Sequence, residues 1–185
     1  NLLFARIDAG QSINDQIRED LSHLARRYRV DGNPLKSAEA RQQLMTRVDV
    51  IPPSMALAQA ANESAWGRSR FAIEANNLFG IWTYDKNLGL KPKNRDEEKT
   101  HLVRKFDDVG DSIAYYMRML NSHPAYHELR DIRQLARKKG YTPSGLELAE
   151  GLGKYSAKGK QYILLIQELI EQNRWSRLDL LQPPA

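Results

Sequence analysis

The segment MALAQAANESAW places one carboxylate among mostly apolar residues. Four of its residues follow at spacings i, i+3, i+4 and i+7 and so share one face of a helix: Gln59, Asn62, Glu63 and Trp66. Burial beside apolar side chains disfavours the charged form of a carboxyl group, and the negative end of a helix dipole acts in the same direction. Glu63 is therefore expected to donate protons near neutral pH, as a general acid does. The alternative is a structural glutamate that is hydrogen-bonded inside the core.

A second motif follows this helix, with the sequence Asn76-Asn77-Leu78-Phe79-Gly80-Ile81-Trp82. Asparagine tolerates the left-handed backbone region, so Asn76 and Asn77 are expected to form a tight turn. Such a turn would lead from the apolar helix into the next element. It would also bring Trp82 and Tyr84 to the border of any cleft beside the helix.

Taken together, the two motifs resemble the catalytic segment of the bacterial cell-wall N-acetylglucosaminidases of flagellar and autolysin type, glycoside hydrolase family 73. That family has an apolar helix ending in Gln-x3-Glu-Ser-x-Trp-Gly, then an Asn-Asn-Leu-Phe-Gly-Ile turn, and both blocks match here in order and spacing. Within the family the chain is similar to Bax-type proteins. The resemblance covers about residues 53–170 and continues through three segments: Phe106-x5-Ser112-Ile113-x2-Tyr116, His123-Pro124-Ala125-Tyr126 and Gly151-Leu152-x2-Tyr155-Ser156-x5-Tyr162.

The resemblance implies a mainly helical, lysozyme-like α+β fold, in which a helical lobe and a small β-hairpin lobe flank a glycan groove. It implies hydrolysis of the β-1,4 bond after N-acetylglucosamine in peptidoglycan, without a cofactor, and Glu63 matches the position of the family's general acid. Two alternatives remain open. One is a muramidase or lytic transglycosylase on the same fold, and the other is a non-catalytic module that binds peptidoglycan.

A second carboxylate is the next requirement, because glycoside hydrolysis ordinarily uses a pair. Glu97 and Glu98 lie at a chain distance from Glu63 similar to that of the family's proposed second acid. Both could instead belong to a solvated, charged hairpin tip. The N-acetyl group of the substrate could then attack the anomeric carbon in their place.

Further groove residues are expected among the aromatic and amide side chains. Tyr155 is expected to act with the catalytic acid on the strength of its motif, although family members commonly carry an acidic residue shortly after this position, where this chain has Ala157 and Lys158. Trp66 is expected to pack in the core. The expected substrate-binding residues are Gln59, Asn76, Asn77, Phe79, Trp82, Tyr84 and Tyr126.

The helices and strands that must position these residues are predicted from the spacing of apolar residues and from the residues that begin or end a helix. Ser54 is expected to cap the central helix after Pro52-Pro53, and Asp107 or Asp108 to begin the helices that follow the hairpin. The basic run Arg137-Lys138-Lys139 is expected to be a solvated helix end. The predicted helices cover 13–30, 37–47, 55–66, 109–121, 124–130, 131–139, 143–151 and 159–174, with a β-hairpin between about 80 and 106.

Composition narrows the classes of function. The 185 residues include no Cys, which excludes thiol catalysis and disulfides, and 28 Lys and Arg face 23 Asp and Glu, a net charge of +5. This excess is spread thinly, so a nucleic-acid partner is not expected, and no segment is apolar for long enough to span a membrane. His123 and His127 have no third metal ligand nearby, and no metal is expected.

We expect a monomeric single domain, with a helical extension over about 1–50 and a core over about 51–175. We expect it in the periplasm or secreted, with its signal segment absent from this chain.

Overall fold

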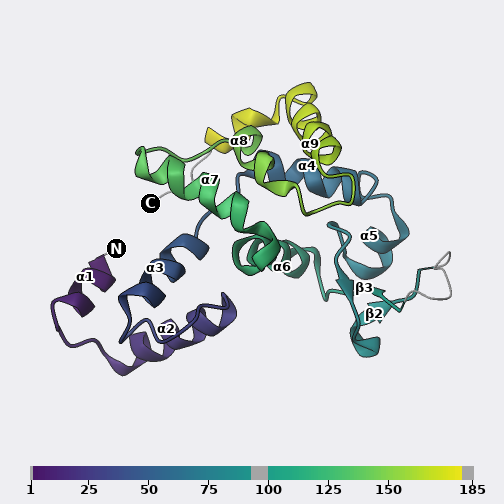
Figure 1. The fold of residues 1–185 in the computed structure, drawn as a ribbon. Helices are drawn as coiled ribbons and strands as arrows, with labels where there is room; N and C mark the ends of the chain where they lie inside the picture. Colours follow the sequence, from purple (N-terminus) through teal and green to yellow (C-terminus); the bar gives the residue numbers. More distant parts are fainter. Residues whose placement is uncertain (1, 93–99, 181–185) are drawn as a thin grey trace.

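The computed structural model describes residues 2–92 and 100–180 and is mainly helical with one small sheet, as predicted (Figure 1). The helices are α1 (Leu2–Asp8), α2 (Asp15–Arg27), α3 (Ala38–Arg47), α4 (Pro53–Glu63), α5 (Arg70–Ala75), α6 (Val109–Ser122), α7 (His127–Lys138), α8 (Gly145–Ala149) and α9 (Lys160–Gln172). The strands are β1 (Trp82–Thr83), β2 (Gly89–Leu90) and β3 (Leu102–Arg104). Short 3-10 turns are η1 (Lys86–Leu88), η2 (Pro124–Tyr126), η3 (Glu150–Leu152) and η4 (Trp175–Leu180). Within the described ranges, no helix has the length and apolar character needed to cross a membrane.

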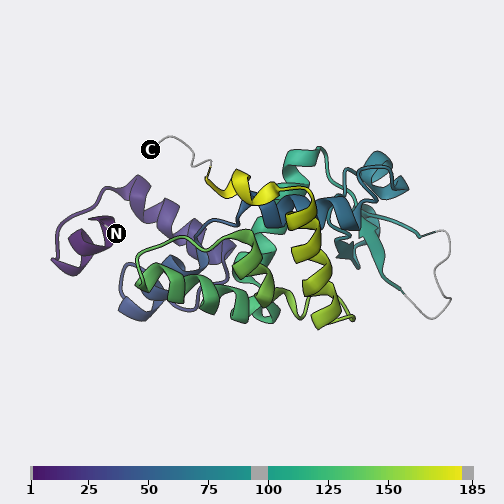
Figure 2. The same cartoon turned by 90° about the horizontal axis from the view of Figure 1, so that it is seen from above.

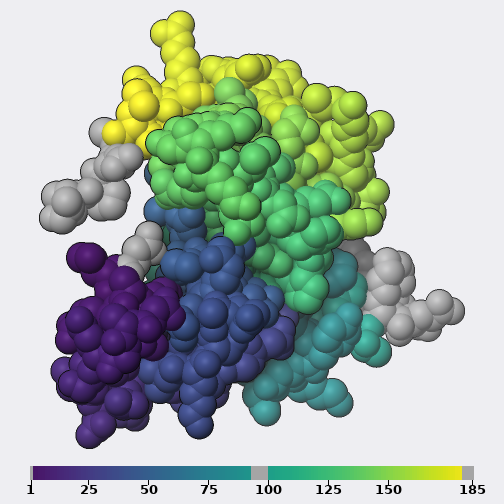
Figure 3. All heavy atoms as spheres, turned by 60° about the vertical axis from the view of Figure 1, so that its left-hand side comes forward, coloured from purple at the N-terminus to yellow at the C-terminus, as the bar shows by residue number. Residues whose placement is uncertain are grey.

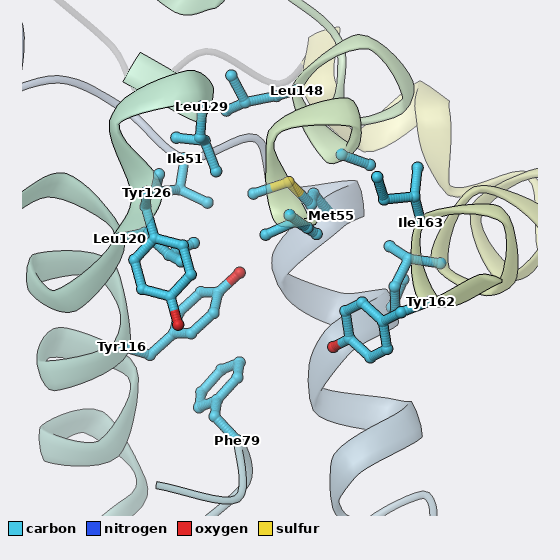
Figure 4. Packing of buried hydrophobic residues seen from close by; sticks show 14 of the residues in the cluster. Ile51, Met55, Phe79, Tyr116, Leu120, Tyr126, Leu129, Leu148, Tyr162 and Ile163 are labelled. Atoms are coloured by element: carbon cyan, nitrogen blue, oxygen red, sulfur yellow. The ribbon is translucent and has the colours of Figure 1, made fainter. Parts of the chain in front are cut away.

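The arrangement places α1, α2 and α3 at one end of the molecule and the sheet at the other, with α4 between them (Figures 1 and 2). This central helix packs against α8, α9 and η4. Its side chains Met55 and Ala58 are fully buried, as the Ala-rich sequence predicts for a helix with close neighbours on most sides. Figure 4 shows Met55 between Leu129 and Leu148 on one side and Ile163 on the other. Burying a side chain of this size contributes about 1.5–3 kcal/mol.

The start of α4 differs from the prediction. Ser54 was expected to be the N-cap, but the N-cap is Pro52, which has no side chain that can accept a hydrogen bond. The carboxylate of Asp179 takes this role: it accepts from the backbone N of Ser54 (2.9 Å), from Ser54 Oγ (2.7 Å) and from the backbone N of Gly145 (2.8 Å). One acid from η4 therefore accepts from backbone amides at the starts of both α4 and α8, which have no acceptor within their own helix.

The sheet has three antiparallel strands in the order β1-β3-β2, so the expected hairpin is present with one more strand than a simple pair. Trp82 lies opposite Val103, and Gly89 opposite Arg104. A Cβ atom at Gly89 would lie 2.5 Å from Leu102 Cβ, so only glycine allows β2 to approach β3 this closely. The stretch between β2 and β3 includes residues 93–99, which lie outside the described ranges.

The N-terminal helices form their own small core around Ile13, Leu21 and Leu44. In the space-filling view they make a block below α7, in purple and dark blue (Figure 3). Arg133 of α7 joins this block to the rest: it is 1% exposed and donates to the carbonyl oxygens of Thr46 (2.9 Å) and Val50 (2.8 Å). Arg133 Nε also lies 3.5 Å from Oδ2 of Asp49. A buried arginine therefore fixes how α3 meets α7.

The structure corrects the predicted bounds of α7 and the predicted environment of the basic residues at its end. Two separate helices were predicted over 124–130 and 131–139. The structure instead has the 3-10 turn η2 followed by one continuous helix, α7, because neither Gly nor Pro interrupts residues 127–138. Arg137 and Lys138 do lie in the last turn, as predicted. Arg137 is not simply solvated, however, since its Nη2 donates to Oδ1 of Asp49 over 2.7 Å.

Candidate active site

A cleft of about 990 Å³ runs beside the end of α4. Its walls come from the end of α2, from α4, from the turn before β1, from α6 with the residues that follow it, and from the loop after η3. Glu63 is the one acidic residue among the described residues that line it. A second hollow, of about 570 Å³, lies between α3 and α7, and its acid, Asp49, is already paired with arginines. The first cleft, which contains Glu63, is therefore the candidate active site.

Glu63 is the last residue of α4 and is half-buried. Its Oε1 accepts hydrogen bonds from the hydroxyl of Tyr162 (2.8 Å) and from Nδ2 of Asn62 (3.0 Å). Tyr162 projects from α9, which packs along α4, so helix packing sets this contact. Oε1 is thus held by two donors, while Oε2 makes no hydrogen bond among the described residues.

Behind Glu63, three buried side chains form a chain of hydrogen bonds. The hydroxyl of Tyr116 donates to Oε1 of Gln59 (2.6 Å), and Nε2 of Gln59 donates to the Tyr162 hydroxyl (2.9 Å), which in turn donates to Glu63. Each polar group in this chain is satisfied, as buried polar groups must be. The carboxylate orientation is therefore tied to α4, α6 and α9 together.

The phenols around Glu63 remain protonated at any ordinary pH. Burial, and then the nearby Glu63 charge, raise the pKa of Tyr162 far above its usual value and that of Tyr126 to about 12. Burial also raises the pKa of Tyr155, with neighbouring tyrosines and Glu63 adding to the effect. These hydroxyl groups act as hydrogen-bond donors rather than as bases.

Gly80 faces the other oxygen of the carboxylate. It has a left-handed backbone with φ of 62°, and a Cβ atom placed there would lie 3.3 Å from Oε2 of Glu63. Both the conformation and the space favour glycine. The absence of a side chain leaves Oε2 open to the cleft.

Tyr155 lines the cleft, where the sequence analysis expected it. Its hydroxyl donates to the carbonyl oxygen of Phe79 over 2.9 Å, and its ring stacks on Tyr162 with centroids 5.4 Å apart. A backbone carbonyl therefore takes the place of an acidic partner for this hydroxyl. This bond anchors the residue that directly precedes Gly80.

Four of the expected substrate-binding residues line the cleft: Phe79, Trp82, Tyr84 and Tyr126. Trp82 is 58% exposed and stacks on His101 with centroids 4.0 Å apart, and Tyr84 is 75% exposed. Exposed aromatic faces at a cleft edge are suited to stacking on sugar rings. Phe79 is buried and stacks on Tyr116, with centroids 3.9 Å apart (Figure 4).

Three other expected binding residues are not among the residues that line the cleft. Gln59 is fully buried behind Glu63, because its amide is used between Tyr116 and Tyr162. Asn76 ends α5 in the left-handed region, with φ of 51°, and Nδ2 of Asn76 donates to the carbonyls of residues 106 and 107. Asn77 is 1% exposed and bonds the backbone of Ile81, so both asparagines build the turn, as their residue type predicts.

The structure leaves the expected second acid untested and contradicts the expected burial of Trp66. Glu97 and Glu98, the candidates for the second acid, lie outside the described residues. Trp66, expected in the core, is 53% exposed and meets Trp175 with centroids 5.7 Å apart.

Sequence reasoning did not assign roles to Tyr116 and Tyr162, although both lie in the motifs quoted for the resemblance. Their hydroxyls are the groups that reach Glu63 directly or through Gln59. The signal that could have found them is the placement of a polar-tipped aromatic residue at an interior helix position, which requires a hydrogen-bond partner.

A central helix that ends in a half-buried glutamate, beside a cleft between a helical lobe and a small antiparallel sheet, defines a lysozyme-like α+β glycoside hydrolase fold. Residues 38–175 match the glucosaminidase family, described as mannosyl-glycoprotein endo-beta-N-acetylglucosaminidase, and the chain belongs to this family. The family resemblance found in the two motifs is thereby confirmed.

Two curated relatives support the assignment. The chain is 32% identical to protein bax of Escherichia coli (strain K12) over 157 residues, which are 85% of this chain and 56% of that protein. It is 33% identical to the peptidoglycan hydrolase FlgJ of Vibrio parahaemolyticus (serotype O3:K6, strain RIMD 2210633) over 87 residues, 41% of this chain and 28% of that protein. The chain thus spans about half or less of the length of these relatives. No solved structure matches it.

Proposed function

We propose that this protein hydrolyses peptidoglycan, cleaving the β-1,4 bond after N-acetylglucosamine, with Glu63 as the general acid. The observation that carries the proposal is the position of Glu63: an acid at the end of the central helix, with one oxygen held by Tyr162 and the other facing the open cleft. Membership of the glucosaminidase family and the similarity to a peptidoglycan hydrolase support the choice of substrate.

In this mechanism the glycan strand lies along the cleft, with sugar rings against Trp82 and Tyr84. Glu63 donates its proton to the glycosidic oxygen as the bond to the anomeric carbon breaks, and the leaving sugar departs with a hydroxyl group. The Tyr162 hydroxyl then stabilises the carboxylate that results, because a hydrogen bond to the charged form favours it. The oxygen of a water molecule then bonds to the anomeric carbon, and the proton released by that water returns the carboxylate of Glu63 to its acid form.

The second group of the reaction is proposed to be Glu97 or Glu98, with the N-acetyl group of the substrate as the alternative. The reaction needs a single second group, so we expect one of Glu97→Gln and Glu98→Gln to lower turnover strongly and the other to have little effect. Full activity of the double Gln variant would leave substrate-assisted attack as the mechanism.

The bond that is cut is tested by product analysis on purified peptidoglycan. Mass spectrometry of the released fragments should find N-acetylglucosamine at the new reducing ends. Muramic acid reducing ends would indicate a muramidase, and 1,6-anhydro ends a lytic transglycosylase. Binding to peptidoglycan without any release of fragments would indicate a non-catalytic binding module.

The location follows from the proposed substrate. Peptidoglycan lies in the bacterial cell envelope, so we propose that the protein acts in the periplasm or after secretion, on its own and without a cofactor. Fractionation of cells that produce the natural protein would test this.

A further inference from the structure

Three arginines form a basic cluster on the wall of the cleft. Arg27 ends α2, Arg29 follows it, and Arg118 lies on α6, so two elements far apart in the sequence bring these cations together. In Figure 1 the end of α2 approaches α6. Tyr115, His123 and Tyr126 lie on the same cleft wall.

Among the residues that the structure describes, these cations have no partner acid. Within residues 2–92 and 100–180, the guanidinium groups of Arg27, Arg29 and Arg118 make no hydrogen bond or ion pair, and Glu63 is the one acid among the described residues that line the cleft. The guanidinium carbon of Arg118 lies 5.2 Å from the centre of the Tyr115 ring. The arginines with structural roles behave differently, since Arg133 and Arg137 both pair with Asp49.

The cations also act on one another. Burial, and then the charge of Arg27, lower the pKa of Arg118, and burial followed by the charge of Arg29 lowers that of His123. Like charges gathered on the wall of a cleft repel one another and raise the local potential, which attracts anions. An anionic ligand would relieve this repulsion.

Other arginines hold the cluster in place. Arg29 has a left-handed backbone, with φ of 56°, and its carbonyl oxygen and that of Tyr28 both accept from Nη1 of Arg47. On the other element, the buried Arg130 donates to the carbonyls of Leu120 (3.0 Å) and His123 (2.9 Å) and fixes the end of α6. The backbone that carries the cluster is therefore braced from both sides.

We propose that Arg27, Arg29 and Arg118 bind the carboxylate groups of the stem peptides that peptidoglycan carries on its muramic acid residues. This inference rests on the proposed function, because it assumes that the cleft holds a peptidoglycan strand. The sugar that Glu63 acts on is uncharged, whereas stem peptides bear free carboxylates at regular intervals along the strand. Guanidinium groups bind carboxylates with two parallel hydrogen bonds, and the cluster shares a single cleft with Glu63.

The test measures binding without turnover. The Glu63→Gln protein is titrated by calorimetry with a disaccharide–tripeptide fragment, and with the same fragment after its peptide carboxylates are converted to amides. Adding Arg27→Gln and Arg29→Gln should weaken binding of the free acid about tenfold, since two ion pairs with the peptide carboxylates are lost. Binding of the amidated fragment should be unchanged. Arg118→Gln should act in the same direction.

Arg26→Gln is the matched control. Arg26 precedes Arg27 on α2 and carries the same charge, but it is not among the residues that line the cleft, so its removal should leave both affinities as they were. Equal affinity of the unaltered cluster for the free and amidated fragments would overturn the inference, as would equal losses for both fragments in the cluster variants.

Turnover is scored separately, on purified peptidoglycan with native Glu63. Carboxylate-dependent binding without any turnover would overturn the proposed hydrolysis and support the basic cluster. Turnover without carboxylate-dependent binding would overturn the cluster and support the hydrolysis.

Discussion

The hydroxyl of Tyr162 donates a hydrogen bond to Oε1 of Glu63 over 2.8 Å and accepts one from Gln59, so a residue of α9 sets the orientation of the carboxylate at the end of α4. The two residues are 99 positions apart in the chain, and only the packing of α9 on α4 brings them together. The fold therefore fixes Oε1 of Glu63, whereas Oε2 is open to the cleft.

Tyr162→Phe should separate the orientation of Glu63 from the stability of the fold. The variant keeps the ring that stacks on Tyr155 but loses the hydroxyl, leaving Nε2 of Gln59 without its partner. We expect the free energy of unfolding to fall by about 1–2 kcal/mol and turnover on peptidoglycan by at least about tenfold.

Tyr116→Phe is the control, because its hydroxyl bonds Gln59 and does not touch Glu63. It should cost a similar amount of stability, measured by chemical denaturation, and change turnover by less than about threefold. Equal rate losses in the two variants would contradict a specific effect of the Tyr162 hydroxyl on Glu63.

Gly80→Ala should impair turnover by crowding the carboxylate of Glu63, the proposed general acid. The left-handed backbone costs an alanine about 1 kcal/mol, and the added Cβ would press on Oε2 of Glu63 from 3.3 Å. We expect a roughly tenfold lower rate, because small displacements of a reacting group have large effects on catalysis.

Gly67→Ala is the control for Gly80→Ala, because it tests the effect of backbone strain without a contact to Glu63. Gly67 has a similar φ of 76°, but a Cβ atom there would meet no atom of the described residues within 4 Å. It should lose comparable stability in thermal unfolding and keep its turnover. A rate loss at Gly67 as large as that at Gly80 would contradict the contact with Glu63.

Asp49 should make stability depend on pH in the acid range. Burial opposes its charge, but hydrogen bonds from Arg137 and from the Val50 backbone, together with the charge of Arg133, hold the pKa of Asp49 below its usual value. A lowered pKa in the folded state contributes stability that is present above the unfolded pKa of about 3.9 and is lost as the pH falls through the folded pKa.

Asp49→Asn removes this contribution. At pH 7 it should lower the free energy of unfolding by about 3 kcal/mol, because the buried Arg133 loses its compensating charge. Urea denaturation of both proteins should then show the difference shrinking below about pH 4. A difference that stays constant down to pH 2.5 would contradict the ionic role of Asp49.

The sequence predicted the elements whose signals are local. The helices expected over 37–47 and 109–121 are α3 and α6 to within a residue, and Asp108 caps α6 as its type suggests. The helices α1 and α5 were missed because seven and six residues are too short to show a clear period.

The contacts that complete the site depend on packing between distant segments. The capping of α4 by Asp179 joins residues 125 positions apart, and no local pattern marks Asp179 as different from any other acid. Glu63 itself could be predicted because a carboxylate on an Ala-rich helix face is costly without a role. An inward-facing tyrosine on α9 signals that its hydroxyl needs a hydrogen-bond partner, but the sequence does not show that this partner is Glu63, 99 positions away.

The central claim is that Glu63 supplies the proton for glycosidic cleavage, and the turnover of Glu63→Gln on purified peptidoglycan tests it most directly. Glutamine keeps the shape of the side chain and can still accept from Tyr162, but it cannot donate an acidic proton. With folding verified by circular dichroism, the release of reducing ends should fall by about 10²–10⁴-fold. A folded variant that retains more than about a tenth of the wild-type rate would contradict the account.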